Sequence, residues 1–313
     1  MGRLDDIERN VNVRMEEIAR RLGGSVGVVS PVSAPTLELR TGLCAAPASQ
    51  AIFAAVGTAA AVSPTCSPEM WETSPHELLQ LMQYVCSSPH VTSNRRYAEL
   101  VGSLNFDVQS RDATVNAYAT VRDGKEPVIM LLGGAIRFAN LISCAYVGAL
   151  AAREKSATNP LPEITAALGK YCLECRASFS GQQACEFALR YNLHLVAADP
   201  TLGRKARSFA AGLLIGILAH EFGHLALGHC YGSRVNLEIS RNQEREADSF
   251  ASSVISSSPF GDYLVFGTIL WEAVWVWVER ATGQTATTHP LASERLADLI
   301  RANPSVAAEF GLS

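Results

Sequence analysis

The chain begins with apolar residues at helical spacing. They recur every three or four residues and are followed by Gly23-Gly24, a pair that ends helices; the apolar positions are Leu4, Ile7, Val11, Met15, Ile18 and Leu22. This pattern predicts an amphipathic helix, whose apolar face would pack on the rest of the chain or dock on a partner. Residues 25–74 are rich in Pro, Ser, Ala and Gly, which predicts only short elements.

Residues 114–132 carry the pattern of two strands joined by a tight turn. Val and Ile are frequent on both sides of Asp123-Gly124, a turn pair that favours a β-hairpin. Helical spacing dominates before and after this segment, although Pro and Gly interrupt the helices between residues 154 and 205. The expected fold class is therefore α+β and mainly helical, with a small β-hairpin or sheet.

One long apolar stretch runs from Tyr263 to Val278. It contains Glu272 and is shorter than the roughly 20 residues that a membrane-spanning helix needs, so we expect a buried helix and no transmembrane segment. Trp271 and Trp275 lie one helical turn apart within it, which is typical of a helix that packs at the centre of a fold.

Composition narrows the range of partners and compartments. The 313 residues include 26 basic and 30 acidic side chains, for a net charge of −4, so nucleic acid is not an expected partner. The N-terminal segment MGRLDDIERN lacks the positive charge and the following apolar run of a secretory signal, which favours a cytoplasmic location. Eight cysteines are too few for a disulfide scaffold in a chain of this length, so reduced thiols are expected.

Four residues of types that bind metal lie close together in the interrupted helical region. Cys172 and Cys175, with Cys185 and His194, offer the donors of a structural zinc site. A second close pair of cysteines is missing, and the apolar neighbours suit sulfur atoms in a helical core. The core interpretation is therefore preferred.

The motif His220-Glu221-Phe222-Gly223-His224 lies within an apolar helical stretch. Four residues turn an α-helix through about 400°, so the imidazoles of His220 and His224 share one face and can bind the same zinc ion. Glu221 is placed beside that ion, where it can deprotonate a zinc-bound water. Without a metal, two imidazoles and a carboxylate facing a core would carry a desolvation cost of several kcal/mol.

A catalytic zinc ion needs a third protein ligand and an open position. The spacing of the metzincins is not met, because Leu227 and Cys230 stand where that pattern needs Gly and His. A second helical segment offers Glu244, with Asp248 one turn further on the same face. Glu244 is therefore the expected third ligand, and Asp248 can accept the free ring N–H of a ligating histidine.

These residues resemble the gluzincin metallopeptidases, in particular the family of CAAX prenyl proteases, HtpX heat-shock peptidases and small soluble minigluzincins. Further motifs of that family are matched by His229, nine residues after His220, by His289-Pro290 and by Arg295. The family's Asn-Ala-x-Ala strand is matched by Asn116, Ala117, Tyr118 and Ala119. The resemblance covers residues 114–140 and 208–302, in the order that the family has them.

The resemblance implies a zincin-like fold with the small sheet beside the active-site helix. It also implies a zinc metalloendopeptidase that hydrolyses peptide bonds of a protein substrate, by Glu-assisted attack of zinc-bound water. One Zn2+ would bind to His220, His224 and Glu244, with Glu221 as general base and then general acid. His289 would donate a hydrogen bond to the developing oxyanion.

The same resemblance assigns supporting roles around the metal. Arg295 would hold Asp248 or Glu244 through charge-assisted hydrogen bonds. The strand that contains Asn116 would offer an edge to which an extended peptide adds. His229 is expected to interact with a helix C-terminus rather than to bind metal, and Glu246 is expected to be a solvated surface charge.

Two parts are expected along the chain: residues 1–74 with the N-terminal helix, and a catalytic domain over 75–313 with a helical, cysteine-bearing insertion at about 154–205. Well-known family members are membrane-embedded, whereas this sequence shows no membrane-spanning segment, so their lipidated substrates are not expected for this chain.

The cysteine-bearing insertion offers a further hypothesis. The thiolate of Cys172 or Cys185 could occupy the open position on the zinc ion and hold the enzyme in a latent form.

Two other functions remain open. An ImmA/IrrE-like or phage-exclusion-type peptidase also combines an HExxH helix with a later Glu helix, and cleaves one dedicated protein. A non-catalytic, zinc-stabilised regulator would use the N-terminal helix and the Trp-rich helix as docking surfaces. Proximity of His289-Pro290 and Arg295 to the zinc would favour the gluzincin family over the ImmA/IrrE-like group. A zinc site closed by four protein ligands would indicate a regulator instead of an enzyme.

Overall fold

The computed structural model describes residues 66–153, 161–229, 236–257, 261–282 and 290–305. The chain separates into two units, residues 1–47 and 48–313, and all described residues belong to the second unit. The predicted amphipathic helix over residues 4–22, with its proposed docking role, lies outside the described residues.

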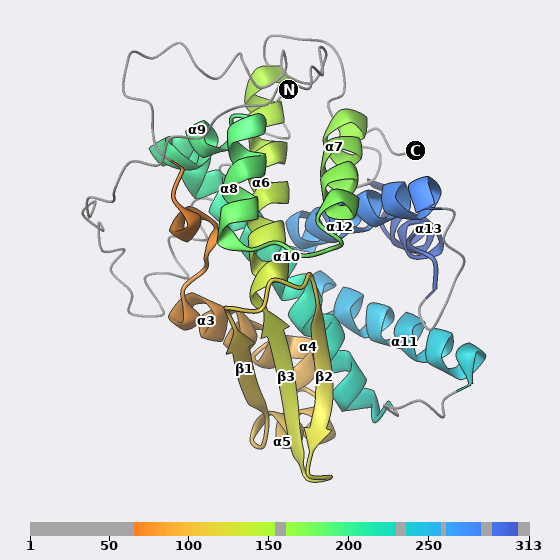
Figure 1. Cartoon of the computed structure of the whole chain (residues 1–313). Coiled ribbons are helices and arrows are strands. Elements are labelled where there is room, and N and C mark those ends of the chain that lie inside the picture. Colours follow the sequence, from red (N-terminus) through yellow and green to blue (C-terminus); the bar gives the residue numbers. More distant parts are fainter. Residues whose placement is uncertain (1–65, 154–160, 230–235, 258–260, 283–289, 306–313) are drawn as a thin grey trace. The chain divides into compact units, whose positions relative to one another are not determined.

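The described part is mainly helical and contains a three-stranded sheet, as expected for an α+β fold (Figure 1). The first half comprises η1 (Pro68–Trp71), α3 (Pro75–Cys86), α4 (Pro89–Thr92), α5 (Arg95–Val101), β1 (Asn105–Gln109), β2 (Ala117–Arg122), β3 (Glu126–Leu132) and α6 (Gly133–Arg153). The second half comprises α7 (Leu161–Glu174), α8 (Gly181–Arg190), α9 (Leu193–Ala198), α10 (Pro200–Leu227), α11 (Leu237–Ser256), α12 (Gly261–Thr282) and α13 (Ala292–Ala302).

The predicted hairpin forms, and a third strand joins it. β2 and β3 are antiparallel, and Asp123 and Gly124 between them have positive φ angles of 52° and 68°. This left-handed conformation at both turn residues is the one that Asp-Gly favours. β1 pairs with β3 in parallel, which gives the order β1-β3-β2 and leaves β2 at an edge of the sheet.

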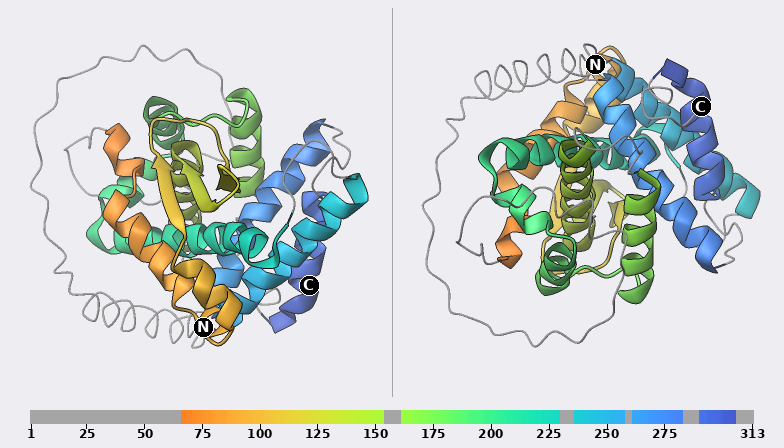
Figure 2. Two further views of the ribbon diagram at one scale, coloured as in Figure 1. Left: turned by 90° about the horizontal axis from the view of Figure 1, so that it is seen from below. Right: turned by 90° about the horizontal axis from the view of Figure 1, so that it is seen from above.

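The helix α10 is the centre of the fold. Its N-terminus is capped by Asp199, whose carboxylate accepts hydrogen bonds from the N–H groups of Thr201 and Leu202, and Pro200 occupies the first turn. Helices α6, α11 and α12 pack along it, and strands β2 and β3 also contact it. Figure 2 shows these elements around α10 from two further directions. The sheet therefore lies beside the helix that carries the HExxH motif.

By length and composition, α10 is the one described helix that could cross a membrane. However, 67% of its most apolar stretch is buried inside the protein, as in the core helix of a fold. The apolar stretch over 263–278 lies within α12, where Trp271 contacts Phe138 of α6 with ring centroids 5.2 Å apart. This agrees with the predicted packing helix.

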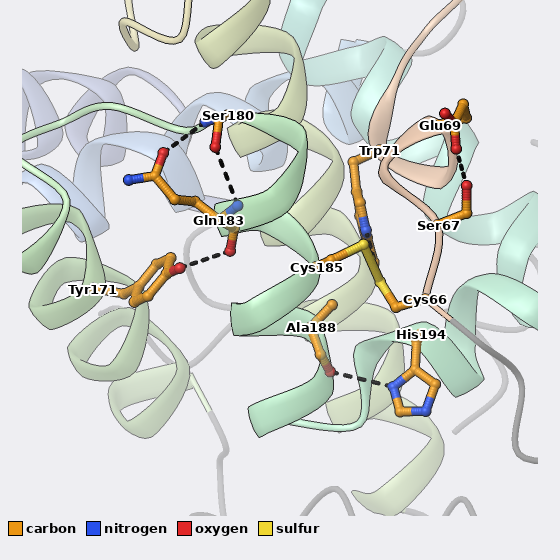
Figure 3. The surroundings of a disulfide bond; sticks show 10 residues. All are labelled: Cys66, Ser67, Glu69, Trp71, Tyr171, Ser180, Gln183, Cys185, Ala188 and His194. Carbon is orange, nitrogen blue, oxygen red and sulfur yellow. Dashed lines mark hydrogen bonds between the residues drawn. A yellow bond between two sulfur atoms is a disulfide. The ribbon is translucent and has the colours of Figure 1, made fainter. Parts of the chain in front are cut away.

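A disulfide links Cys66, just before η1, to Cys185 of α8 (Figure 3). The expectation that all thiols are reduced is therefore wrong for these two residues, because the fold brings together segments 119 residues apart. Trp71 packs against the bond, and its indole N–H donates to the Cys66 sulfur at 3.3 Å. Cys172 remains free and buried, and burial raises the pKa of its thiol to about 12.

Candidate metal centre

His220 and His224 lie on adjacent turns of α10 and face the same point. Their Nε2 atoms are 3.1 Å apart, and their ring centroids are 4.8 Å apart. Both side chains are largely buried, with exposed fractions of 14% and 8%. The helical spacing of the HExxH motif thus brings the two imidazoles together as predicted.

Glu244 of α11 completes a group of three donors. Its carboxylate oxygens lie 3.3 Å from Nε2 of His220 and 3.6 Å from Nε2 of His224. Helix α11 packs closely on α10, where Phe250 covers Gly223, and a Cβ at Gly223 would lie 3.1 Å from Cβ of Phe250. The absence of a side chain at Gly223 thus lets the ring of Phe250 approach α10 closely.

The three donor atoms have the spacing that one metal ion requires. Atoms bound to a tetrahedral ion at about 2.1 Å are about 3.4 Å apart, and the three distances here are 3.1, 3.3 and 3.6 Å. Two imidazole nitrogens and one carboxylate oxygen are the donors of catalytic zinc sites. The residues therefore fit a divalent metal ion such as zinc.

Among the described residues, His220, His224 and Glu244 form the sole such group of three or more potential ligands. The alternative site at Cys172, Cys175, Cys185 and His194 does not form. The sulfur of Cys185 is bonded to Cys66 and so offers no thiolate, and Nδ1 of His194 lies 3.4 Å from the Ala188 carbonyl oxygen (Figure 3). The same disulfide removes Cys185 as a latent zinc ligand.

Two charged residues form a chain of hydrogen bonds with the ring nitrogen of His220 that faces away from Glu244. Nδ1 of His220 lies 2.8 Å from Oδ1 of Asp248, and Arg295 of α13 donates to both oxygens of that carboxylate. Asp248 thus lies where the sequence placed it, and Arg295 contacts Asp248, one of its two expected partners. In the neutral ring, Nδ1 would donate to Asp248 and the lone pair would lie on Nε2, the nitrogen that faces Glu244 and His224.

The two imidazoles differ in their electrostatics. Burial alone would lower the pKa of His220, but hydrogen bonds to the carboxylates of Asp248 and Glu244 raise it to about 10. Burial and the neighbouring His220 lower the pKa of His224 to about 4. Burial opposes the charge of Asp248, yet Arg295 and His220 hold its pKa well below the usual range. The carboxylates of Asp248 and Glu244 thus stabilise positive charge at this point, as they would stabilise a bound cation.

Glu272 of α12 is a member of this network that sequence reasoning did not assign. Its Oε1 lies 3.2 Å from Nη1 of Arg295, its side chain is 2% exposed, and its Oε2 has no hydrogen-bond partner among the described residues. Burial raises the pKa of this carboxyl to about 7, although Arg295 opposes the shift. The signal in the sequence was a single carboxylate in an otherwise apolar helix.

A cavity of about 350 Å³ opens beside the three donors. Its lining includes His220, Glu221 and Glu244, together with Asn116 and Ala117 at the start of β2. Tyr118 and Ala119, which follow along β2, do not line the cavity. His289 lies outside the described residues, whereas the adjacent Pro290 lines the cavity.

His229 and Glu246 contact each other next to the site. His229 is buried at the C-terminal end of α10, with its Nδ1 2.9 Å from Nδ1 of His224. Glu246 is 63% exposed, as predicted for a surface charge, but its carboxylate lies 3.0 Å from Nε2 of His229. Glu246 is therefore a surface charge, as expected, whose carboxylate also contacts a buried imidazole.

Comparison with known proteins gives one match. A family model described as Peptidase U49 matches residues 210–309. This range contains all three candidate ligands and Arg295, but it covers less than half of the chain. No curated protein and no solved structure match. The chain is thus similar to a peptidase family over the segment that carries the candidate metal centre, which supports peptidase activity.

Proposed function

We propose that the protein is a zinc-dependent metallopeptidase that hydrolyses peptide bonds of a protein or peptide substrate. The observation that carries this proposal is the convergence of Nε2 of His220, Nε2 of His224 and the Glu244 carboxylate at tetrahedral spacing. The opposite ring nitrogens of both histidines contact other side chains, which leaves both Nε2 atoms facing the common point where a metal ion would bind. The Peptidase U49 match supports the reaction class.

When bound, zinc would polarise the scissile carbonyl and make water acidic enough to attack it near neutral pH. Glu221 follows His220 on α10 and lines the cavity, so its carboxylate takes the proton from the attacking water. The same carboxylate then delivers a proton to the leaving amine. Asp248 and Arg295 hold the His220 ring in its orientation during these steps.

The substrate would bind along β2. This strand pairs with β3 on one side and lies at an edge of the described sheet, and the cavity reaches Asn116 and Ala117 at its start. An extended peptide can add to such an edge through main-chain hydrogen bonds. Donation of a hydrogen bond to the oxyanion by His289 follows from the resemblance and is supported by Pro290 in the cavity lining.

Among metallopeptidases, the contacts favour the gluzincin family of CAAX prenyl proteases and HtpX peptidases over an ImmA/IrrE-like or phage-exclusion-type enzyme. The distinguishing motifs of the first family, Arg295 and the His289-Pro290 pair, are represented here by Arg295 against Asp248 and Pro290 at the cavity. A zinc-stabilised regulator is less well supported, because a structural site needs four protein ligands and three converge among the described residues.

Two variants test the proposal against the wild type. Glu221→Gln should retain zinc and lose peptide hydrolysis, because the base is removed while the ligands remain. Glu244→Ala should lose much of the zinc after dialysis against a weak chelator. Zinc content would be measured by elemental analysis, and hydrolysis by mass spectrometry of new peptide termini in a proteome-derived peptide mixture. Turnover by Glu221→Gln equal to the wild type would reject the mechanism, and a wild type that takes up no zinc would reject the metal.

A further inference from the structure

Nδ1 of His224 contacts a second histidine, whereas Nδ1 of His220 contacts the carboxylate of Asp248. Nδ1 of His224 and Nδ1 of His229 are 2.9 Å apart, and the His229 side chain is 5% exposed. Two imidazole nitrogens at hydrogen-bond distance share one proton, so one ring donates and the other accepts. On the far side of His229, Nε2 lies 3.0 Å from the carboxylate of Glu246.

One arrangement of protons satisfies all of these contacts. If Nε2 of His224 offers its lone pair to a metal ion, the ring carries its proton on Nδ1 and donates to His229. Nδ1 of His229 then accepts, so this neutral ring carries its proton on Nε2 and donates to Glu246. When His229 is neutral, the contacts from Glu246 to His224 therefore favour the tautomer of His224 that binds metal through Nε2.

The local backbone holds His229 in this position. Gly228 ends α10 with a φ of 70°, a left-handed conformation that glycine adopts without strain. The chain reverses there, and the N–H of His229 donates to the carbonyl of His224 at 3.0 Å. The backbone of His229 is thus tied to the residue that its ring contacts. Glu246 follows Glu244 by two residues on α11, so one helix supplies both a candidate ligand and the carboxylate that contacts His229.

We propose that His229 and Glu246 are positioning residues for His224, which fix its tautomer and ring orientation and so strengthen metal binding. The proposal rests on the metal site of the proposed function. The contacts from Glu246 through His229 to His224, here called the relay, would act on His224 as Arg295 and Asp248 act on His220. The two chains of contacts differ, because Asp248 is held by Arg295, which is 22% exposed, whereas Glu246 is 63% exposed. The effect of Glu246 should therefore be smaller than that of His229.

Zinc affinity of the full-length protein, measured by competition with a chelator at fixed pH, tests this proposal. His229→Ala removes the acceptor for His224 and should weaken zinc binding by about 10- to 100-fold. Glu246→Gln should weaken it by a few-fold. Glu238→Gln provides the matched control, because Glu238 is an exposed carboxylate on the same helix, and it should bind zinc like the wild type.

A double-mutant comparison separates the relay from general effects on stability. His229→Asn can keep an acceptor near the position of Nδ1 but loses the contact with Glu246, so it should rescue part of the loss in His229→Ala. Adding Glu246→Gln to His229→Asn should then cause no further loss. In the zinc-loaded wild type, nitrogen NMR of labelled histidine should find His224 protonated on Nδ1 and His229 protonated on Nε2.

The outcomes distinguish this proposal from the proposed function. If the wild type binds zinc and hydrolyses peptides while His229→Ala and Glu246→Gln bind zinc as tightly as Glu238→Gln, the relay is rejected and the peptidase remains. Additive effects of His229→Asn and Glu246→Gln would also reject the relay. A wild type without zinc affinity would overturn both.

Discussion

Arg295 donates two hydrogen bonds to the carboxylate of Asp248, from Nε to Oδ2 at 2.8 Å and from Nη2 to Oδ1 at 2.7 Å. Its third nitrogen, Nη1, lies 3.2 Å from Oε1 of Glu272. One guanidinium therefore pairs with two carboxylates: that of Asp248, which contacts the candidate ligand His220, and that of Glu272, which is buried on α12. The forked geometry of arginine allows this, whereas the single ammonium of lysine does not.

Arg295→Ala should destabilise the protein strongly, because it leaves the carboxylates of Asp248 and Glu272 without their shared cation. Breaking a buried ion pair on one side costs on the order of 3–5 kcal/mol, and Arg295 is 22% exposed, so about 2–3 kcal/mol is expected in urea unfolding. Arg301→Ala is the matched control on the same helix, because Arg301 is 74% exposed, and it should change the free energy of unfolding little. Equal effects of the two variants would contradict this assignment.

Glu272→Gln should change how the free energy of unfolding depends on pH. The pKa of Glu272 is raised from 4.5 to about 7, so between these values the folded chain binds more protons than the unfolded chain. Stability from this group is therefore present at low pH and falls as pH rises from 4.5 to about 7, by at most about 3 kcal/mol. The amide introduced by the substitution cannot ionise, which removes this contribution.

The measurement is urea unfolding of the metal-free protein at pH 5 and pH 8. Relative to the wild type, Glu272→Gln should be more stable at pH 8 than at pH 5, provided that the amide oxygen still accepts from Arg295. A difference between variant and wild type that stays constant over this range would show that Glu272 is already ionised at pH 5.

Zinc binding should release about one proton at pH 7. A metal-bound imidazole has lost its proton, and the pKa of His220 is raised to about 10, so this ring is protonated before the metal arrives. The pKa of His224 is lowered to about 4, so that ring is already neutral. Affinity should therefore rise about tenfold per pH unit near neutrality. Calorimetry in two buffers of different ionisation enthalpy counts the protons, and a count of zero would contradict the prediction.

The Cys66–Cys185 disulfide should contribute to stability by restricting the unfolded chain. With the two cysteines 119 positions apart in the sequence, the loop-closure term is about 4–5 kcal/mol. Cys66→Ser with Cys185→Ser should lower the free energy of unfolding by up to this amount under oxidising conditions. Under reducing conditions the variant and the wild type should have similar stability. Cys144→Ser serves as a control for loss of a buried thiol that forms no bond.

Several features of this protein follow from local sequence alone. The interval of four residues between His220 and His224 places both rings on one helical face, whatever the surroundings of the helix. Asp123-Gly124 adopts the two left-handed conformations of a hairpin turn because Asp tolerates a positive φ better than most residues and glycine has no side chain that opposes it. The mainly helical α+β class, the hairpin and the buried helix over 263–278 could therefore be predicted from residues close together in the chain.

Other features depended on how distant segments pack. Glu244 faces the two imidazoles because α11 packs against α10, where Phe250 covers Gly223. The parallel strand β1 and the disulfide pair join segments that no local pattern connects. Nothing near Glu246 in the sequence indicates that its carboxylate reaches His229.

The physical reason lies in the range of the interactions. Helical periodicity and turn conformation are set by the backbone of a few consecutive residues, so the sequence determined which side chains could share a face. The partner of each buried polar group is set by tertiary packing, because its hydrogen bond must be found among groups that the fold brings within about 3 Å. The structure alone decided that Arg295 serves both Asp248 and Glu272, and that His224 contacts His229.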